Sequence, residues 1–300
     1  MQVTLIHNPG SGDEEISSEQ LLTLIRNAGH DVVYQSTRED NWDTALKNPG
    51  DWVAVAGGDG TVGKVAKRLV SRSIPIAVLP LGTANNIAKT LKLADTPLDR
   101  LINSWTTART IPFDGAIVSG AWGTTYYIES FGIGLFANTM LKAAKSDAME
   151  QYSAQEEIVA ALQMLQENLQ NYPAKGLDIR LDGQGFSGEY IGVEVMNIAS
   201  VGSNLYLAPN ANPGDGLLDV VLLTKDDRHK LDEYLSRRLA GKQQPPPLTI
   251  HRGKQIQIQG EAFDIHIDDE MRSSSDLSAF ATSAVIDIKI DPHVLTFLVA

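Results

Sequence analysis

Residues 57–61, Gly-Gly-Asp-Gly-Thr, place three glycines, a carboxylate and a hydroxyl in consecutive positions. They follow the apolar run Val53–Ala56, which is typical of a buried strand, and Thr61 has the pattern of a helix start. A helix N-terminus behind glycines attracts phosphate, because its N–H groups are unpaired and no side chain blocks the approach. Asp59 would repel phosphate unless a cation lay between them. The segment therefore predicts a metal–nucleotide site, although similar turns also occur in α/β proteins without a ligand.

Two other loops have the same character. The apolar run Val3–Ile6 leads into residues 8–12, Asn-Pro-Gly-Ser-Gly. The run Ile76–Leu79 leads into residues 80–86, Pro-Leu-Gly-Thr-Ala-Asn-Asn. Open α/β sheets bind ligands at the carboxyl ends of their strands, so we expect the three loops to meet at one edge of a sheet.

The three loops together resemble one family. Asn8-Pro9-x-Ser11-Gly12, residues 57–61 and Pro80-Leu81-Gly82-Thr83-x-Asn85 are similar to segments of the diacylglycerol kinase catalytic-domain family. The resemblance is to its soluble bacterial lipid kinase branch (YegS-like), with sphingosine and ceramide kinases as distant kin. NAD kinases share the Gly-Gly-Asp-Gly-Thr segment and phosphofructokinases have a similar loop, but the Pro-Leu-Gly-Thr-x-Asn segment separates the lipid kinases from both.

The resemblance implies ATP and Mg²⁺ as cofactors and a nucleotide site built from loop residues. The residues expected there are Asn8, Pro9, Gly10, Ser11, Gly12, Thr37, Gly57, Gly58, Asp59, Gly60, Thr61, Gly63, Gly82, Thr83 and Asn85. Asp59 and Asp114 are also expected to act in catalysis, through the magnesium ion of the nucleotide.

The resemblance also implies a proton acceptor. The family has Asp-Gly-Glu where this chain has Asp268-Asp269-Glu270, and its glutamate is regarded as the base for the substrate hydroxyl. Glu270 would then be the base and Asp268 its partner. A hydroxyl is a poor nucleophile and needs such an acceptor when it attacks phosphorus. Asp269 replaces the family's glycine, which puts the shape of the turn in doubt.

A second metal site follows from the resemblance of residues 213–219, Pro-Gly-Asp-Gly-Leu-Leu-Asp. In the family this segment holds a structural magnesium ion through one aspartate and two backbone carbonyls. Here Asp215 would supply the carboxylate, and Asn212 and Leu217 the carbonyls. Such an oxygen set suits a hard cation. A simple Asp-Gly turn without an ion is the alternative.

Composition limits the other classes. The chain has 300 residues, 43% of them apolar, a formal net charge of −12 and no cysteine. This charge argues against nucleic acid as a partner and allows only transient peripheral contact with a membrane. No apolar run approaches a membrane span, and no signal peptide is evident at the start. We therefore expect a cytoplasmic enzyme with a lipid or small-molecule alcohol substrate, and a homodimer is compatible with the sequence.

Residues 1–110 alternate strands with helices, which predicts a parallel sheet in an α/β nucleotide-binding domain like that of NAD kinases and phosphofructokinases. The expected strands are 2–7, 31–36, 52–56 and 75–79, with helices at 15–28, 40–47, 61–71 and 84–92. Residues 111–285 indicate a mainly antiparallel β-sandwich for the substrate. The family resemblance further implies that 286–300 pack back on the first domain. The strands of this second domain are expected at 111–118, 125–133, 176–181, 190–199, 217–223, 248–251, 255–259 and 263–267, with helices near 135–171 and 228–240.

The leading function is therefore an ATP- and Mg-dependent kinase that phosphorylates a hydroxyl of diacylglycerol or a related lipid. An NAD kinase-like enzyme is one alternative, but the paired residues that grip the NAD ribose in that family have no clear counterpart here. A phosphofructokinase-like sugar-phosphate kinase lacks the expected arginine set. A non-catalytic nucleotide-sensing protein descended from the kinase fold remains a further alternative, because of Asn86 and Asp269.

Asn86 stands where many relatives have an aspartate that joins Asp59 and Asp114 in a magnesium network. Our hypothesis is that Glu129 supplies the missing charge; the alternative is that Glu129 is only a polar strand residue. If the hypothesis holds, Glu129→Gln raises the magnesium concentration needed for activity, and Asn86→Asp in the same protein restores much of the loss. Residues that share an ion should depart from additivity by about 0.5–3 kcal/mol. Additive effects in this double-mutant cycle would show that the two positions are unconnected.

Overall fold

The computed structural model describes residues 1–12, 16–146, 152–260, 263–277 and 285–299. The chain forms two compact units: a first unit, Met1–Asp114 with His293–Ala300, and a second unit, Gly115–Pro292. It passes from one unit to the other twice, within strands β5 (Arg109–Gly120) and β18 (Val285–Val299).

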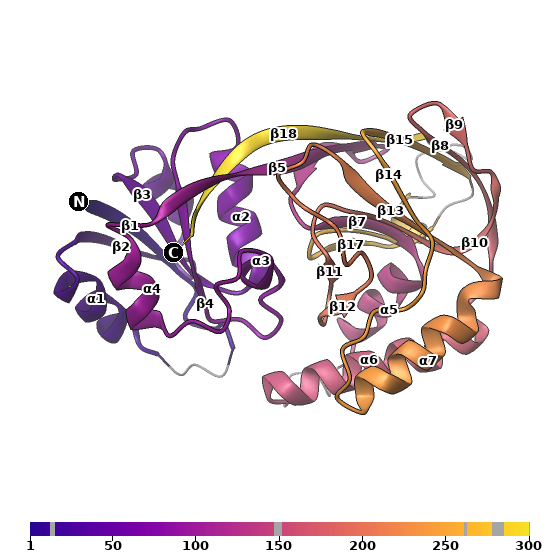
Figure 1. Ribbon diagram of the computed structural model, residues 1–300, viewed down its shortest axis with the longest axis horizontal. Helices are drawn as coiled ribbons and strands as arrows, with labels where there is room; N and C mark the ends of the chain where they lie inside the picture. Colours follow the sequence, from indigo (N-terminus) through magenta and orange to yellow (C-terminus); the bar gives the residue numbers. More distant parts are fainter. Residues whose placement is uncertain (13–15, 147–151, 261–262, 278–284, 300) are drawn as a thin grey trace. The chain divides into compact units, whose positions relative to one another are not determined.

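The first unit is built on a parallel sheet with strand order β2-β1-β3-β4 (Figure 1). The strands are β1 (Gln2–His7), β2 (Asp31–Ser36), β3 (Trp52–Gly57) and β4 (Ile76–Pro80), and the end of β18 extends the sheet beside β4. Every residue of β3 is buried, as expected of a central parallel strand whose two faces are covered. The helices are α1 (Ser18–Asn27), α2 (Asp59–Leu69), α3 (Asn86–Thr90) and α4 (Leu98–Ser104), with a 3₁₀ turn η1 (Trp42–Leu46).

The second unit is an antiparallel assembly with strand order β17-β16-β7-β10-β8-β15-β18, in which β13 pairs with β10 and β14 with β13. Its strands are β6 (Gly123–Tyr127), β7 (Ser130–Gly134), β8 (Lys175–Leu181), β9 (Gln184–Gly185), β10 (Gly188–Met196), β11 (Ser200–Val201), β12 (Leu205–Tyr206), β13 (Leu218–Thr224), β14 (Ile250–Gly253), β15 (Gln255–Gly260), β16 (Ile265–Ile267) and β17 (Glu270–Arg272). Its helices are α5 (Leu135–Ala143), α6 (Ala154–Asn171), α7 (Arg228–Leu239) and α8 (Ser274–Leu277), with a 3₁₀ turn η3 (Lys225–Asp227). The predicted fold class, a parallel α/β unit and an antiparallel sandwich, is confirmed.

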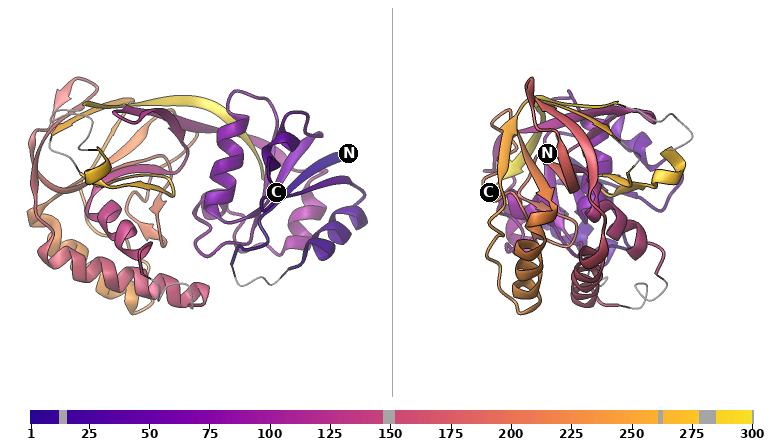
Figure 2. Two further views of the ribbon diagram at one scale, coloured as in Figure 1. Left: turned by 180° about the vertical axis from the view of Figure 1, so that it is seen from behind. Right: turned by 90° about the vertical axis from the view of Figure 1, so that its right-hand side faces the viewer.

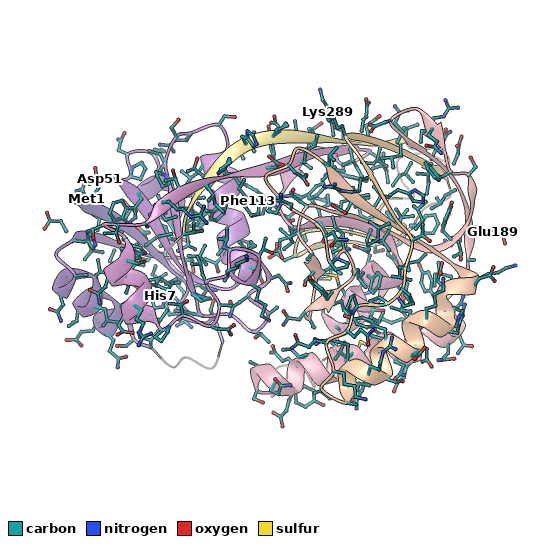
Figure 3. The ribbon with its side chains drawn as sticks, viewed as in Figure 1. Met1, His7, Asp51, Phe113, Glu189 and Lys289 are labelled. Atoms are coloured by element: carbon teal, nitrogen blue, oxygen red, sulfur yellow. The ribbon has the colours of Figure 1, made fainter. Side chains whose placement is uncertain are left out.

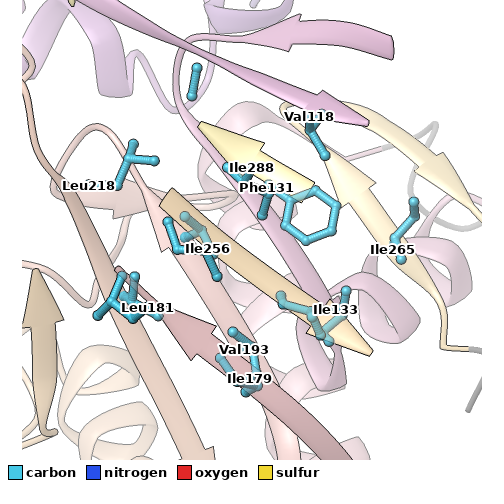
Figure 4. Packing of buried hydrophobic residues seen from close by; sticks show 14 of the residues in the cluster. Val118, Phe131, Ile133, Ile179, Leu181, Val193, Leu218, Ile256, Ile265 and Ile288 are labelled. Atoms are coloured by element: carbon cyan, nitrogen blue, oxygen red, sulfur yellow. The ribbon is translucent and has the colours of Figure 1, made fainter. Parts of the chain in front are cut away.

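Two hydrophobic clusters hold the second unit together. The first lies between strands and includes Phe131, Ile133, Val193 and Ile265 (Figure 4). The second joins the strands to helices α6 and α7, which run side by side in Figures 1 and 2. Leu162, Leu165 and Leu169 of α6 are buried in it and Ile158 packs against it, so the helix face predicted from their spacing is confirmed.

The structure corrects two expected elements. The helix expected near 135–171 is two helices, α5 and α6, and part of the segment between them, 147–151, lies outside the described residues. Helix α6 begins at a capping box in which Ser153 and Glu156 exchange hydrogen bonds, a Ser-x-x-Glu signal that the sequence contains. The strand expected at 125–133 is interrupted at Ile128 and Glu129, because their N–H groups donate to the side chain of Asp268 instead of to a strand.

Among the described helices, none combines the length and the apolar character that crossing a membrane requires.

Candidate functional site

The three glycine-containing loops of the first unit contact one another at the carboxyl ends of β1, β3 and β4. Asn8 Nδ2 donates to Thr61 Oγ1 at 3.2 Å, which joins the first loop to the second. A Cβ on Gly82 would lie 2.3 Å from the Cα of Gly58, so the second and third loops touch through their backbones. A Cβ on Gly12 would lie 2.3 Å from the carbonyl oxygen of Leu81, which joins the first loop to the third. The structure thus brings together the three loops that the sequence predicted to meet.

Asp59 is the first residue of helix α2, although the sequence indicated a start at Thr61. Its carboxylate oxygens accept the backbone N–H groups of Asn86 at 2.8 Å and Ile87 at 2.9 Å. These N–H groups belong to the first turn of α3, so Asp59 caps a helix that follows it by 27 residues. The carboxylate therefore fixes the third loop relative to the second.

The third loop is closed by Asn85, which takes the left-handed conformation with φ 51°. Asn85 Oδ1 accepts the N–H of Gly82 at 3.0 Å, and its Nδ2 donates to the carbonyl of Gly82 at 2.6 Å. The side chain of Asn85 thus holds the third loop closed through two hydrogen bonds to the backbone of Gly82. Asn86 is 2% exposed, and its carbonyl accepts the hydroxyl of Thr90.

The other residues predicted for the nucleotide site lie at the same edge or in α2. Thr37 follows β2, and its N–H donates at 2.8 Å to the carbonyl of His7, which ends β1 (Figure 3). Gly10 lies in the first loop, where its N–H donates to Asn8 Oδ1. Gly60 and Gly63 lie within α2, and Gly63 is buried there. Their contact with a nucleotide remains a prediction.

In the second unit, Asp268 and Asp269 form the two-residue turn between β16 and β17, and Glu270 opens β17 opposite Ile267. Asp268 takes the left-handed conformation with φ 52°, which this kind of turn requires and which aspartate tolerates. The carboxylate of Asp268 is buried and accepts N–H groups from Ile128 and Glu129 at 3.1 and 2.9 Å. Its backbone N–H donates to the carbonyl of Ser130 at 2.8 Å. The aspartate thus anchors the hairpin, while Glu270 is exposed and lies 3.5 Å from Arg272.

Asp114 and Glu129 are both buried. Asp114 belongs to the first unit, and its carboxylate accepts the N–H of His293 at 2.8 Å, close to the point where β18 enters that unit. The carbonyl of Glu129 accepts the N–H of Asn197 at 2.8 Å in the second unit. Their proposed action on magnesium remains a prediction.

Asp215 lies in the turn before β13 and forms an ion pair with Arg252. Its Oδ1 accepts the N–H of Leu217 at 3.1 Å, and its own N–H donates to the carbonyl of Asn212 at 3.3 Å. Arg252 also lies 3.5 Å from Asp219, a buried carboxyl whose pKa is raised by burial against the opposing effect of that arginine. The Asn212 carbonyl thus accepts the backbone N–H of Asp215, and the Asp215 carboxylate is paired with an arginine; a metal role for this set remains a prediction.

Within the described residues, no group of three or more His, Asp or Glu side chains is placed to hold a metal ion. Magnesium bound with a nucleotide needs only one or two carboxylates, because phosphates and waters complete its shell. Asp59 suits that role, since a carboxylate that accepts two N–H groups keeps further lone pairs. Asp215 suits a metal less well while Arg252 is paired with it.

The sequence did not indicate a buried pair of ionisable residues behind the hairpin. His266 and Glu194 are fully buried, and Nε2 of the histidine lies 2.9 Å from Oε2 of the glutamate. The available signal was one charged or titratable residue inside each of two apolar strands, Ile265-His266-Ile267 and Val193-Glu194-Val195. A buried ionisable group needs a partner, so two such groups in one sheet can be expected to pair with each other.

Comparison with known families matches two domains to this chain. Residues 2–116 match the diacylglycerol kinase catalytic domain, and residues 140–299 match the YegS C-terminal NAD kinase beta sandwich-like domain. A probable lipid kinase YegS-like of Pseudomonas aeruginosa is 28% identical over 226 residues, which are 73% of this chain and 70% of that protein. The diacylglycerol kinase of Bacillus subtilis is 26% identical over 230 residues, 74% of this chain and 73% of that protein.

Solved structures share the fold. A putative diacylglycerol kinase from Bacillus anthracis superposes with a TM-score of 0.74 at 22% identity, covering 100% of this chain and 96% of that one. Yeast NADH kinase complexed with NADH gives a TM-score of 0.54 at 10% identity, covering 100% of this chain and 83% of the other. The second likeness is one of architecture, as the sequence indicated by comparison with NAD kinases.

The two hydrogen bonds of Asp59 predict a measurable role in stability. Asp59→Ala removes the acceptor from the first turn of α3 and should lower the free energy of unfolding by about 0.5–2 kcal/mol. Asp59→Asn keeps one acceptor oxygen and should lose less. Urea unfolding without nucleotide measures both, with Asp95→Ala, an exposed aspartate of the same unit, as the control. If Asp59→Ala is as stable as the wild type, the carboxylate does not hold α3.

Proposed function

Since this chain belongs to the diacylglycerol kinase catalytic-domain family, we propose that it transfers the γ-phosphoryl group of ATP to a hydroxyl group of a lipid. The observation that carries the proposal is the match of two consecutive domains, over residues 2–116 and 140–299, to the two parts of a lipid kinase. The contacts among the three loops of the first unit support it.

The first unit would bind the nucleotide at the N-terminus of α2. Gly58 precedes this helix without a side-chain cap, so the helix start can receive an anion. Gly58 and Gly82 approach so closely that a Cβ on Gly82 would lie 2.3 Å from the Cα of Gly58 and force the two loops apart, whereas a Cβ on Gly58 would be tight, at 3.1 Å from the Cα of Gly82. These glycines therefore serve two purposes, since they bring the loops together and leave their backbone open to phosphate.

Asp59 would hold the magnesium ion of the nucleotide, together with phosphate oxygens and water. When bound, the ion neutralises charge that develops on the transferred phosphoryl group. The protein contributes the position of the carboxylate, which the N–H groups of Asn86 and Ile87 fix from behind. Asp114 would act on the same ion as a second carboxylate, and Asp215 with the carbonyls of Asn212 and Leu217 would hold a structural ion in the second unit.

The second unit would provide the proton acceptor. Glu270 is exposed at the start of β17, so a substrate hydroxyl can reach its carboxylate. As the oxygen of that hydroxyl attacks phosphorus, its proton would pass to Glu270. Asp268 would set the position of Glu270 through the hairpin rather than by touching the substrate, because its carboxylate is turned onto the backbone of residues 128–130.

The relatives' names make diacylglycerol the first acceptor to test. The protein should be incubated with γ-labelled ATP, magnesium and a total lipid extract, and the labelled products identified by chromatography and mass spectrometry. We expect label in a phosphorylated lipid, and about a thousandfold less with Asp59→Asn, which removes an electrostatic contact to the transition state. The absence of label from every lipid would contradict the proposal, as would label in NAD when NAD is added to the same incubation.

Glu270→Gln should separate binding from turnover. The amide keeps the size of the side chain but cannot accept the proton, so turnover should fall by about a hundredfold to ten-thousandfold. Affinity for Mg-ATP, measured by calorimetry, should stay at the wild-type value. Glu189→Gln, which changes an exposed glutamate on β10 of the same unit, is the control and should leave both unchanged. If Glu270→Gln weakens nucleotide binding as much as it slows turnover, Glu270 is a nucleotide or metal ligand rather than the base.

A further inference from the structure

The buried pair Glu194–His266 lies directly behind the hairpin that carries Glu270. Glu194 is on β10 and His266 on β16, and the two strands lie on either side of β7. Both residues are in register with the same residue of β7, Gly132. The two side chains therefore start two strands apart and meet above the strand that separates them.

Gly132 makes this meeting possible. A Cβ at this position would lie 2.1 Å from Oε1 of Glu194 and 2.2 Å from Nε2 of His266, closer than any carbon can approach. The neighbours Phe131 and Ile133 point to the other face of the sheet, into the hydrophobic cluster of Figure 4. The glycine thus leaves an opening in one face of β7, and the carboxylate and the imidazole fill it.

The hydrogen bonds determine how many protons the pair holds. Nδ1 of His266 lies 3.2 Å from the carbonyl oxygen of Asp268, which can only accept, so Nδ1 carries a proton. The 2.9 Å contact between Nε2 and Oε2 of Glu194 needs a second proton, which belongs to either atom. The pair is neutral overall in both cases. If that proton leaves, a carboxylate and a lone pair face each other in a site without water exposure.

We propose that Glu194 and His266 are positioning residues for the kinase reaction: the proton shared between Glu194 and Nε2 fixes the imidazole, whose Nδ1–H holds the carbonyl of Asp268 and with it the turn that presents Glu270. This inference rests on the proposed function for the role of Glu270. The attachments of the turn include, first, the imidazole on the Asp268 carbonyl and, second, the hydrogen bonds of the Asp268 carboxylate and N–H to the backbone of residues 128–130. Loss of the first attachment leaves the second, so the hairpin should loosen without unfolding.

Three substitutions separate the parts of this arrangement. Gly132→Ala keeps both side chains and drives them apart with one methyl group. Glu194→Leu removes the partner of Nε2. Glu194→Gln keeps the hydrogen bond, because its amide N–H donates to Nε2 while Nδ1 still donates to Asp268, but it has no proton to lose. Tyr234→Phe is the control, since it removes a buried hydrogen bond of the same unit, from Tyr206, without contact to the hairpin.

Hydrogen exchange of residues 265–272, followed by mass spectrometry on the full chain without substrate, reads the hairpin directly. We expect faster exchange in Gly132→Ala and Glu194→Leu, and wild-type exchange in Glu194→Gln and Tyr234→Phe. Turnover of dioctanoylglycerol with Mg-ATP should follow the same order, with kcat lower by roughly a hundredfold in the first two variants. The KM for ATP should not change, because the nucleotide loops are in the other unit.

The shared proton also has a pH signature. Burial raises the pKa of Glu194; burial alone would lower the pKa of His266, but Glu194 raises it overall, above 6.5. The proton is therefore fully bound at lower pH, and its stabilisation is lost as the pH rises through the folded-state pKa. Two other titratable groups interact with the pair. One is the Asp268 carboxylate, and the other is the hydroxyl of Tyr127, a buried residue whose pKa burial raises well above its usual value. The wild-type hairpin should lose protection at alkaline pH, where protection is the exchange rate of the unfolded chain divided by that of the folded protein at the same pH, and Glu194→Gln should keep its protection.

Hairpin exchange at the wild-type rate in folded Gly132→Ala would overturn the inference, as would Glu194→Gln behaving like Glu194→Leu. If Gly132→Ala does not fold, the pH comparison between the wild type and Glu194→Gln decides. The proposed function fails separately: full turnover in Glu270→Gln would remove Glu270 as the base, while the exchange data would still report whether the pair holds the hairpin.

Discussion

The hydrogen bond from a backbone N–H to a carboxylate organises both units of this protein. In the first unit the Asp59 carboxylate accepts N–H groups from the first turn of α3, and in the second unit the Asp268 carboxylate accepts the N–H groups of residues 128–130. Bonds to a charged acceptor are roughly twice as strong as neutral ones, and each carboxylate satisfies N–H groups that no regular element pairs. One aspartate thereby joins two loops, and the other joins a hairpin to a break between strands.

Much of the first unit could be predicted because its signals are local. Val53–Ala56 is apolar without interruption, the glycines follow at once, and a helix pattern comes next. These three signals lie within about a dozen consecutive residues. The start of α2 at Asp59 was missed by two positions, since glycines obscure the first turn of a helix. The cap that Asp59 provides for α3 could not be foreseen, because the partner N–H groups come 27 and 28 residues later and depend on the packing of two loops.

Non-local pairing explains the larger omissions in the second unit. The family resemblance named Asp268 and Glu270, but it did not indicate that Asp268 binds the backbone 138 to 140 residues earlier. The relation of Glu194, His266 and Gly132 depends on the registers of β10 and β16 with β7, and a shift of one residue would turn each side chain to the other face. Alternation along a strand says which residues share a face; it does not say which strands become neighbours.

The first unit also has a consequence for the order of synthesis. Its last strand segment, from His293 onward, is made only after the whole second unit. Yet Phe297 is buried there, pairs with Ile76 at the sheet edge and packs at a tilt against Phe113, with ring centroids 4.8 Å apart. Until that segment leaves the ribosome, β4 has an open edge and the core lacks an aromatic ring. A premature stop near residue 290 would therefore damage the unit that is translated first, and leave nearly the full length of the later one in place.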